Sequence, residues 1–84
     1  MVYRVYVVKD RVACEASPPF LAKNDQIAQR QMGLMLSKTD TRLFAEFELF
    51  CLGSFDSESM EIDLISGGPR LVQSLDDRME VDRE

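Results

Sequence analysis

The sequence contains no histidine and no tryptophan, and it has only two cysteines among 84 residues. Without histidine, the chain lacks the commonest general base and the commonest nitrogen ligand of zinc. Cys14 and Cys51 are too few for a disulfide framework, and no histidine can activate either thiol as a nucleophile. Both lie in apolar segments, so we expect small buried thiols in a reducing compartment, although a bridge between neighbouring strands stays open.

Long apolar runs are also missing. No segment approaches the roughly 20 residues of a membrane span, and the N-terminal residues do not have a signal-peptide layout. Patterns for a phosphate-binding loop, a zinc site or a catalytic serine are absent as well. The sequence therefore predicts a soluble intracellular protein without membrane contact, catalytic residues, metal or cofactor. Its length predicts one small domain over residues 1–75, followed by an acidic tail over residues 76–84.

Basic residues are fewer than acidic ones, and the formal net charge is −5. The imbalance is uneven, since residues 1–55 carry seven basic and six acidic side chains, whereas residues 56–84 carry nine acidic side chains and three arginines. The overall charge argues against a generic nucleic-acid coat, for which a basic surface is expected. It still allows a local basic surface in the first two thirds of the chain.

What remains is a regular alternation of apolar and polar residues. It predicts an α+β fold of about four antiparallel strands in ββαββ order, with one amphipathic helix on one face. The strands are expected at residues 2–8, 12–16, 43–55 and 60–65, the helix at residues 25–37, and a short helical turn at residues 70–75. Asn24 would cap the helix, and Gly53 would mark a bulge or a close backbone approach. The second face of the sheet would stay partly exposed, which favours a homodimer.

The residues that this pattern assigns to the core include two of the helix and three of the last strand. Leu34 and Met35 belong to the apolar arc of the helix, and Met60, Ile62 and Leu64 would point inward from the last strand. Four acidic side chains alternate with these apolar positions on the last two strands, and they are Glu46, Glu48, Glu61 and Asp63. They could hold a divalent cation, as in a metal-dependent nuclease, but a solvated outer face explains the same alternation more simply.

Basic and aromatic side chains in the first half of the chain suggest a surface for single-stranded nucleic acid. Aromatic rings could stack on bases, although most of them would serve equally well as core residues. The cations that could contact phosphates are Arg4, Lys9, Arg11, Lys23 and Arg30. Lys23 is placed at the positive end of the expected helix, where an anion could bind.

Two blocks of sequence in order, "SPPFLAKNDQIAQR" and "FELFCLGSFDSESMEI", carry a family resemblance. The chain resembles the small nonstructural protein of the gokushoviruses, which are microviruses of Chlamydia, Spiroplasma and other hosts. The matching positions are Pro19, Phe20, Ala22 and Lys23 in the first block, Phe47, Leu49, Leu52, Gly53, Phe55, Asp56 and Ile62 in the second, and Pro69, Leu71 and Val72 near the end. Phe47 replaces the usual tyrosine, and Met60 stands near the glycine that normally closes the turn.

The resemblance implies a phage protein of the infected bacterial cytoplasm that is absent from the virion. It also implies a counterpart of protein C of the phiX-type microviruses, which shifts replication toward single-stranded genome synthesis and packaging. The expected partners are single-stranded DNA and phage replication or assembly proteins. A protein-interaction adaptor, homodimeric or with an acidic surface for a basic partner, is the alternative hypothesis.

Overall fold

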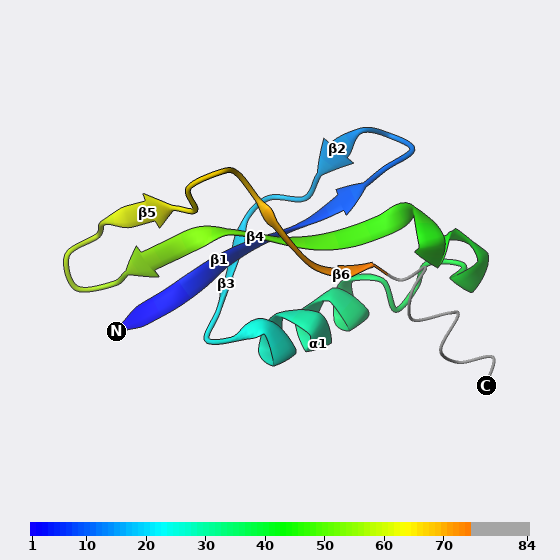
Figure 1. Ribbon diagram of the computed structural model, residues 1–84. Coiled ribbons are helices and arrows are strands. Elements are labelled where there is room, and N and C mark those ends of the chain that lie inside the picture. The colour runs from blue at the N-terminus through cyan, green and yellow to red at the C-terminus, as the bar shows by residue number, and fades with distance from the viewer. Residues whose placement is uncertain (75–84) are drawn as a thin grey trace.

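The fold, described here for residues 1–74 from a computed structural model, is a curled antiparallel sheet with one helix on one face (Figure 1). The α+β prediction is therefore confirmed. The strands are β1 (Val2–Asp10), β2 (Glu15–Ala16), β3 (Phe20–Ala22), β4 (Phe47–Asp56), β5 (Ile62–Leu64) and β6 (Arg70–Ser74). The helix α1 spans Asp25–Met35, and a 3₁₀ helix, η1, spans Thr41–Glu46.

Six strands occupy only four positions in the sheet. The long strands β1 and β4 pair along their whole length at the centre. Both β2 and β3 pair with β1 on one side, and both β5 and β6 pair with β4 on the other. Pro18 and Pro19 separate β2 from β3, because proline cannot donate to the ladder. Gly67 and Gly68, both with positive φ, lie between β5 and β6. The sheet therefore has four strand positions, as predicted, but each of the two outer positions is divided between two short strands.

Gly53 marks both a bulge and a close approach, as predicted. Val5 pairs with Gly53 but Tyr6 pairs with Cys51, so Leu52 is the extra residue of β4. A Cβ atom on Gly53 would overlap the carbonyl oxygen of Asp63 on β5. Only a residue without a side chain lets β4 and β5 pair at this separation.

The core lies between α1 and the sheet face that it covers. Asn24 caps the helix as predicted, since its side chain accepts a hydrogen bond from the Ile27 amide at 2.9 Å. Ala28, Met32 and Leu36 are buried, and the sheet contributes buried Tyr6, Val8, Ala22, Leu49 and Cys51 to the same cluster. The core stripe of the helix therefore follows a spacing of four residues.

The predicted apolar arc of the helix was too wide. Leu34 and Met35 are exposed, and the helix ends at Met35 rather than at residue 37. A second wrong prediction concerns β5, because Met60, Ile62 and Leu64 are exposed rather than core residues. These side chains have no covering element in the described part of the chain, and alternation alone cannot say which face of an outer strand is covered.

Three local predictions also differ from the structure. Residues 70–74 form strand β6 rather than a helical turn, because they find a free edge of β4. Residues 41–46 form η1, so the predicted strand at residues 43–55 begins only at Phe47. Cys14 is exposed in the turn after β1, with a φ of 61°, whereas Cys51 is buried, and both thiols are free. The predicted acidic tail at residues 76–84 lies outside the described residues.

The proposed acidic metal face is not assembled. Glu48 pairs with Lys9 on one side and Ser74 on the other, while Asp63 pairs with Ser54 at the far end of β4. The four carboxylates therefore do not face one another. Within residues 1–74, no group of three or more potential ligands is placed to hold a metal ion, and no helix is long and apolar enough to cross a membrane.

Candidate nucleic-acid interface

The carboxylate of Asp25, at the first position of α1, connects three elements. The Tyr6 hydroxyl of β1 donates a hydrogen bond of 2.7 Å to Asp25 Oδ1. Arg70, the first residue of β6, reaches both carboxylate oxygens with Nη1 at 3.4 Å and Nη2 at 3.3 Å. Arg4 of β1 lies at 3.5 Å from the same carboxylate. Two guanidinium groups, from the strands on either side of β4, are thus held beside the start of the helix.

These contacts determine the protonation states of Asp25 and Tyr6. The hydrogen bond from Tyr6 and those from Arg70 lower the pKa of the Asp25 carboxyl group below its ordinary value. Burial of Tyr6, followed by its bond to a carboxylate, raises the pKa of the phenol well above its ordinary value. At neutral pH the group therefore consists of an ionised carboxylate, a neutral phenol and two guanidinium ions. Both arginines keep about half of their side-chain surface exposed, at 50% for Arg4 and 44% for Arg70.

Beside this group, the surface is hollowed between β1, β4 and the segment that joins β5 to β6. This arginine hollow has a volume of about 350 Å³. Arg4 and Arg70 line it together with the residues Cys51, Gly53, Ser54, Asp63, Leu64 and Ile65. The arginines supply several N–H donors with the fork geometry that suits phosphate, and Asp63 is the acidic residue of the lining.

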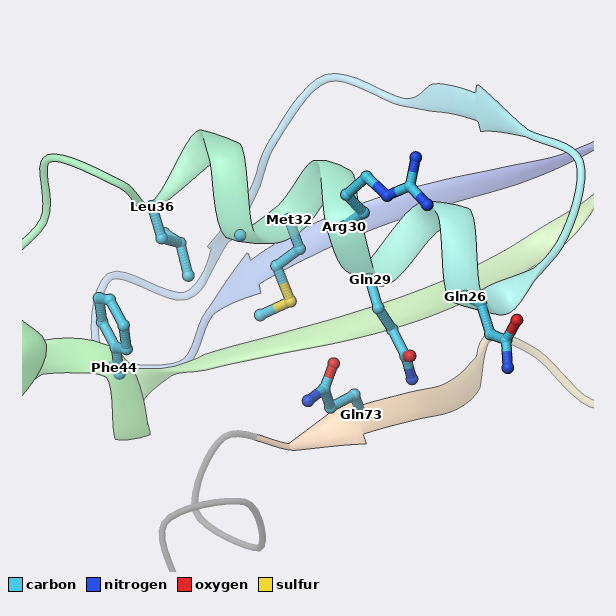
Figure 2. Close-up of a pocket in the computed structure, with 8 residues that line it drawn as sticks. Gln26, Gln29, Arg30, Met32, Leu36, Phe44 and Gln73 are labelled. Carbon is cyan, nitrogen blue, oxygen red and sulfur yellow. The ribbon is translucent and has the colours of Figure 1, made fainter. Parts of the chain in front are cut away.

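A second depression lies between α1 and β6, and Figure 2 shows it in close-up. This glutamine groove has a volume of about 370 Å³ and is lined by Gln26, Gln29, Arg30, Met32, Gly33, Leu36, Phe44 and Gln73. The side chains of Gln29 and Gln73 point toward each other from α1 and β6, and Arg30 stands on the helix with its guanidinium directed away from β6 (Figure 2). Met32, Leu36 and Phe44 provide the apolar part of the lining, of which Met32 and Leu36 also belong to the core.

The chemistry available in the two depressions is that of binding. Amide groups donate and accept hydrogen bonds, the arginines attract anions, and Phe44 adds an aromatic surface. Ser54, the hydroxyl residue of the arginine hollow, has Arg4 and Asp63 as its partners in the sheet register.

The structure brings together only part of the predicted cationic set. Arg4 lines the arginine hollow and Arg30 the glutamine groove. Lys23 is exposed directly before the helix cap, Asn24. Lys9 alternates with Tyr6 and Val8, so it lies on the opposite face.

Arg11, another member of the predicted cationic set, makes two hydrogen bonds to η1. Its guanidinium donates to the Ala45 carbonyl at 2.6 Å, and its backbone amide donates to the Glu46 carbonyl at 2.7 Å. These bonds attach the turn after β1 to η1. Sequence reasoning also missed four lining residues, namely Arg70, Gln26, Gln29 and Gln73. The two helix glutamines belong to the predicted polar side of α1, but the sequence contained no signal that β6 would lie opposite them.

The residues that carry the family resemblance serve the fold. Phe20 stacks on Tyr6, with ring centroids 5.9 Å apart, and Ala22 and Leu49 are buried in the core. Gly53 permits the pairing of β4 with β5. Asp56 accepts a hydrogen bond from the Glu58 amide at 2.9 Å in the turn after β4, and this bond lowers the pKa of its carboxyl group.

Other matching positions lie at the edges of these elements. Phe55 pairs with Tyr3 and Ile62 across the sheet, and Pro19 directly precedes β3. Met60 is the departure with a visible consequence. It adopts a φ of 65°, in the left-handed region that favours glycine, and glycine is the residue that the family pattern places near this position.

Comparison with known proteins gives one match. The family described as Phage ORF5 protein matches residues 3–78, which is nearly the whole chain. No curated protein and no solved structure matches the chain significantly.

Proposed function

The chain belongs to the Phage ORF5 protein family, and from this premise we propose that it is a non-enzymatic phage accessory protein that binds single-stranded DNA on its helix-bearing side. The observation that carries the proposal is the pair of adjoining depressions beside α1. Arg4 and Arg70 would contact phosphates in the arginine hollow, and the amides of the glutamine groove would hydrogen-bond to base edges. Phe44 would offer a stacking surface, as in other proteins that bind single strands.

The size and charge of the site suit a short segment of one strand. Arg70 lines the hollow and binds Asp25, the first residue of α1, and the next helix residue, Gln26, lines the groove. A strand that crosses this ion pair would meet cations at Arg4, Arg70 and Arg30. Because the whole chain is acidic, we expect a dissociation constant of about 1–100 µM at physiological salt, in the range of non-specific binding.

The proposal is tested by fluorescence anisotropy with a labelled single-stranded oligonucleotide of mixed sequence at increasing salt concentrations. Direct phosphate contact predicts that log affinity falls linearly with log salt, with a slope of about −0.7 for each contact. The variant Arg30→Gln should weaken binding and make the slope shallower by about 0.7. Its control is Arg42→Gln, which removes the same charge from an arginine of η1 that is 86% exposed and lines neither depression.

Two results would contradict DNA binding at this site. The first is the absence of any binding at low salt. The second is an equal loss of affinity in Arg30→Gln and Arg42→Gln, because a general loss of positive charge would then explain the effect. Arg4 and Arg70 are less suitable as first targets, since each also contacts Asp25 and its removal would alter the start of α1.

We further propose that the protein is of the gokushovirus type and acts in the host cytoplasm at the switch to single-stranded genome synthesis and packaging. The support is the order and spacing of the two sequence blocks around Phe20 and Gly53. In an infected culture, a phage with the Arg30→Gln change should accumulate duplex replicative DNA and less single-stranded genome than its parent. Equal amounts of both DNA forms in the two phages would exclude this role.

The adaptor function remains the second candidate, and one observation favours it. Asp56, Glu58, Glu61 and Asp63 lie on β4, β5 and the turn between them, and the N-terminal amine lies at 3.9 Å from Asp56 and 3.4 Å from Glu58. A basic replication or assembly protein would fit this end of the sheet. Affinity capture from infected cells with the wild type and with Glu61→Gln/Asp63→Asn would test it, since a genuine adaptor should lose one specific phage partner in the variant.

A further inference from the structure

The face of the sheet opposite α1, here called the helix-free face, is almost entirely apolar. The pairing register places Val7 of β1 beside Phe50 of β4, and Phe50 beside Leu71 of β6. Farther along β4, Gly53 is flanked by Val5 on one side and Leu64 on the other. Val5 and Val7 alternate with the core residues of β1, and the register places the side chains of Phe50, Leu64 and Leu71 on the same face, which α1 does not cover.

Several of these side chains remain largely exposed to solvent. The exposed fraction is 61% for Ile62, 74% for Leu64 and 49% for Leu71. Within the described strands, the charged residues that the register places on this face are Lys9 and Glu48, which are direct cross-strand partners. The face therefore combines an exposed apolar surface with no net charge, although the chain as a whole carries −5.

The same face contains an apolar hollow of about 350 Å³. Val7, Phe50, Leu52 and Pro69 line it, with Lys9 and Ala16 at one side. Leu52 is the bulge residue of β4, and Pro69 precedes β6 after the interruption in the outer strand. One face thus carries both a depression at β1 and β4 and exposed apolar side chains on β5.

We propose that two copies of this chain associate through their helix-free faces in a two-fold symmetric dimer, in which Ile62 and Leu64 of each copy cover the Val7–Phe50–Leu52 hollow of the other. A two-fold interface brings the same surface patch of both subunits together. The projecting region and the hollow that receives it must therefore occur on one face, as Ile62 and Leu64 and the Val7–Phe50–Leu52 hollow do. Two copies can also meet without burying an unpaired charge, because Lys9 and Glu48 are neighbours.

The dimensions of the molecule are sufficient for such an interface. The molecule extends 44 × 23 × 23 Å. Its long face therefore measures about 1,000 Å², against the roughly 800 Å² that each partner of a stable complex usually buries. Dimerisation would leave α1 and the glutamine groove of each copy on the outside. The inference does not depend on DNA binding, but it predicts two grooves per particle if both proposals hold.

The test is the molar mass of the full-length chain in solution. Multi-angle light scattering or sedimentation velocity should give twice the monomer mass of 9.6 kDa at micromolar concentrations. Leu64→Glu should raise the dissociation constant by about 30-fold or more, as expected when a charge enters the centre of an apolar interface. The matched control is Leu34→Glu, because Leu34 is similarly exposed, at 68%, but lies on α1. It should remain dimeric.

Because Leu64 is mostly exposed in the single copy, Leu64→Glu should keep the far-ultraviolet circular dichroism spectrum of the wild type at low concentration. Leu71→Glu provides a second substitution on a different strand of the same face and should also dissociate the dimer. A wild type that stays at 9.6 kDa up to several hundred micromolar would overturn the proposal. So would a dimer that survives both substitutions, or one that Leu34→Glu dissociates equally.

Discussion

The substitution Tyr6→Phe isolates the hydrogen bond between the Tyr6 hydroxyl and Asp25, the first residue of α1. It removes one hydroxyl group and keeps the ring that stacks on Phe20. Tyr6 is fully buried, and its hydroxyl donates to Asp25 Oδ1 at 2.7 Å. The change leaves Asp25 with its two arginine partners and leaves the core volume nearly unchanged. The effect on stability should therefore report the hydrogen bond rather than a cavity.

The magnitude follows from the charge and exposure of the acceptor. A hydrogen bond to a charged group contributes about 1.5–3 kcal/mol to stability. Asp25 keeps 35% of its side-chain surface exposed, so water and the arginines compensate for part of the loss. We expect Tyr6→Phe to lower the free energy of unfolding by about 1–2 kcal/mol. For a domain of this size, that corresponds to a melting temperature lower by about 4–15 °C.

The assay is urea and thermal unfolding followed by circular dichroism between pH 7 and pH 2.5. Because the folded-state pKa of Asp25 lies below its unfolded value, its contribution is fully present above the unfolded pKa. It is lost as the pH falls through the folded pKa. The difference between wild type and Tyr6→Phe should therefore be largest above about pH 5 and should shrink toward pH 2.5. A difference that is absent at pH 7, or that grows in acid, would refute the reasoning.

Three further predictions concern the backbone and the same phenol. Gly53→Ala should cost about 1–3 kcal/mol of unfolding free energy, because its Cβ would collide with β5. Gly33→Ala should instead stabilise α1 by up to about 1 kcal/mol, because its Cβ would have no neighbouring atom within 4 Å. Urea unfolding of both variants compares the two effects. Met60→Gly should stabilise the protein by up to about 1 kcal/mol in the same assay, since it relieves a positive φ. The variant Tyr3→Phe leaves Tyr6 as the remaining tyrosine. The ultraviolet absorbance of this variant should show no tyrosine ionisation at about pH 11 while the protein is folded, because burial raises the pKa of Tyr6.

The centre of the fold could be predicted from the sequence because its signals are local. Alternation identified the long strands that became β1 and β4, and Asn24 identified the start of α1. The outer strands could not be predicted as they are. Residues 70–74 pair with β4 only because β5 stops early and leaves the edge of β4 free, which is a tertiary condition. The pairing register of β5 with β4 is also a tertiary condition, and it places Ile62 and Leu64 away from the core.

The candidate site was only half predictable for a related reason. Arg4 and Arg30 could be chosen from charge alone, and both line a depression. Arg70 and Gln73 lie on the strand that was taken for a helical turn, so no sequence pattern connected them to α1. Arg11 was chosen by the same criterion as Arg4, but it bonds to the backbone of η1. Charge indicates which residues can bind an anion, whereas tertiary structure decides which of them line a common depression.

The family resemblance and the glutamine groove depend on different residues, and this separation shapes what each can support. Phe20, Leu49 and Gly53 carry the resemblance because the fold needs a core ring, a buried leucine and a residue without a side chain at those places. The glutamine groove contains none of the matching positions. The resemblance is therefore grounded in positions that build the sheet, and the proposal of DNA binding in the chemistry of the groove. Arg30→Gln should consequently alter binding without altering stability, whereas Gly53→Ala should lower stability.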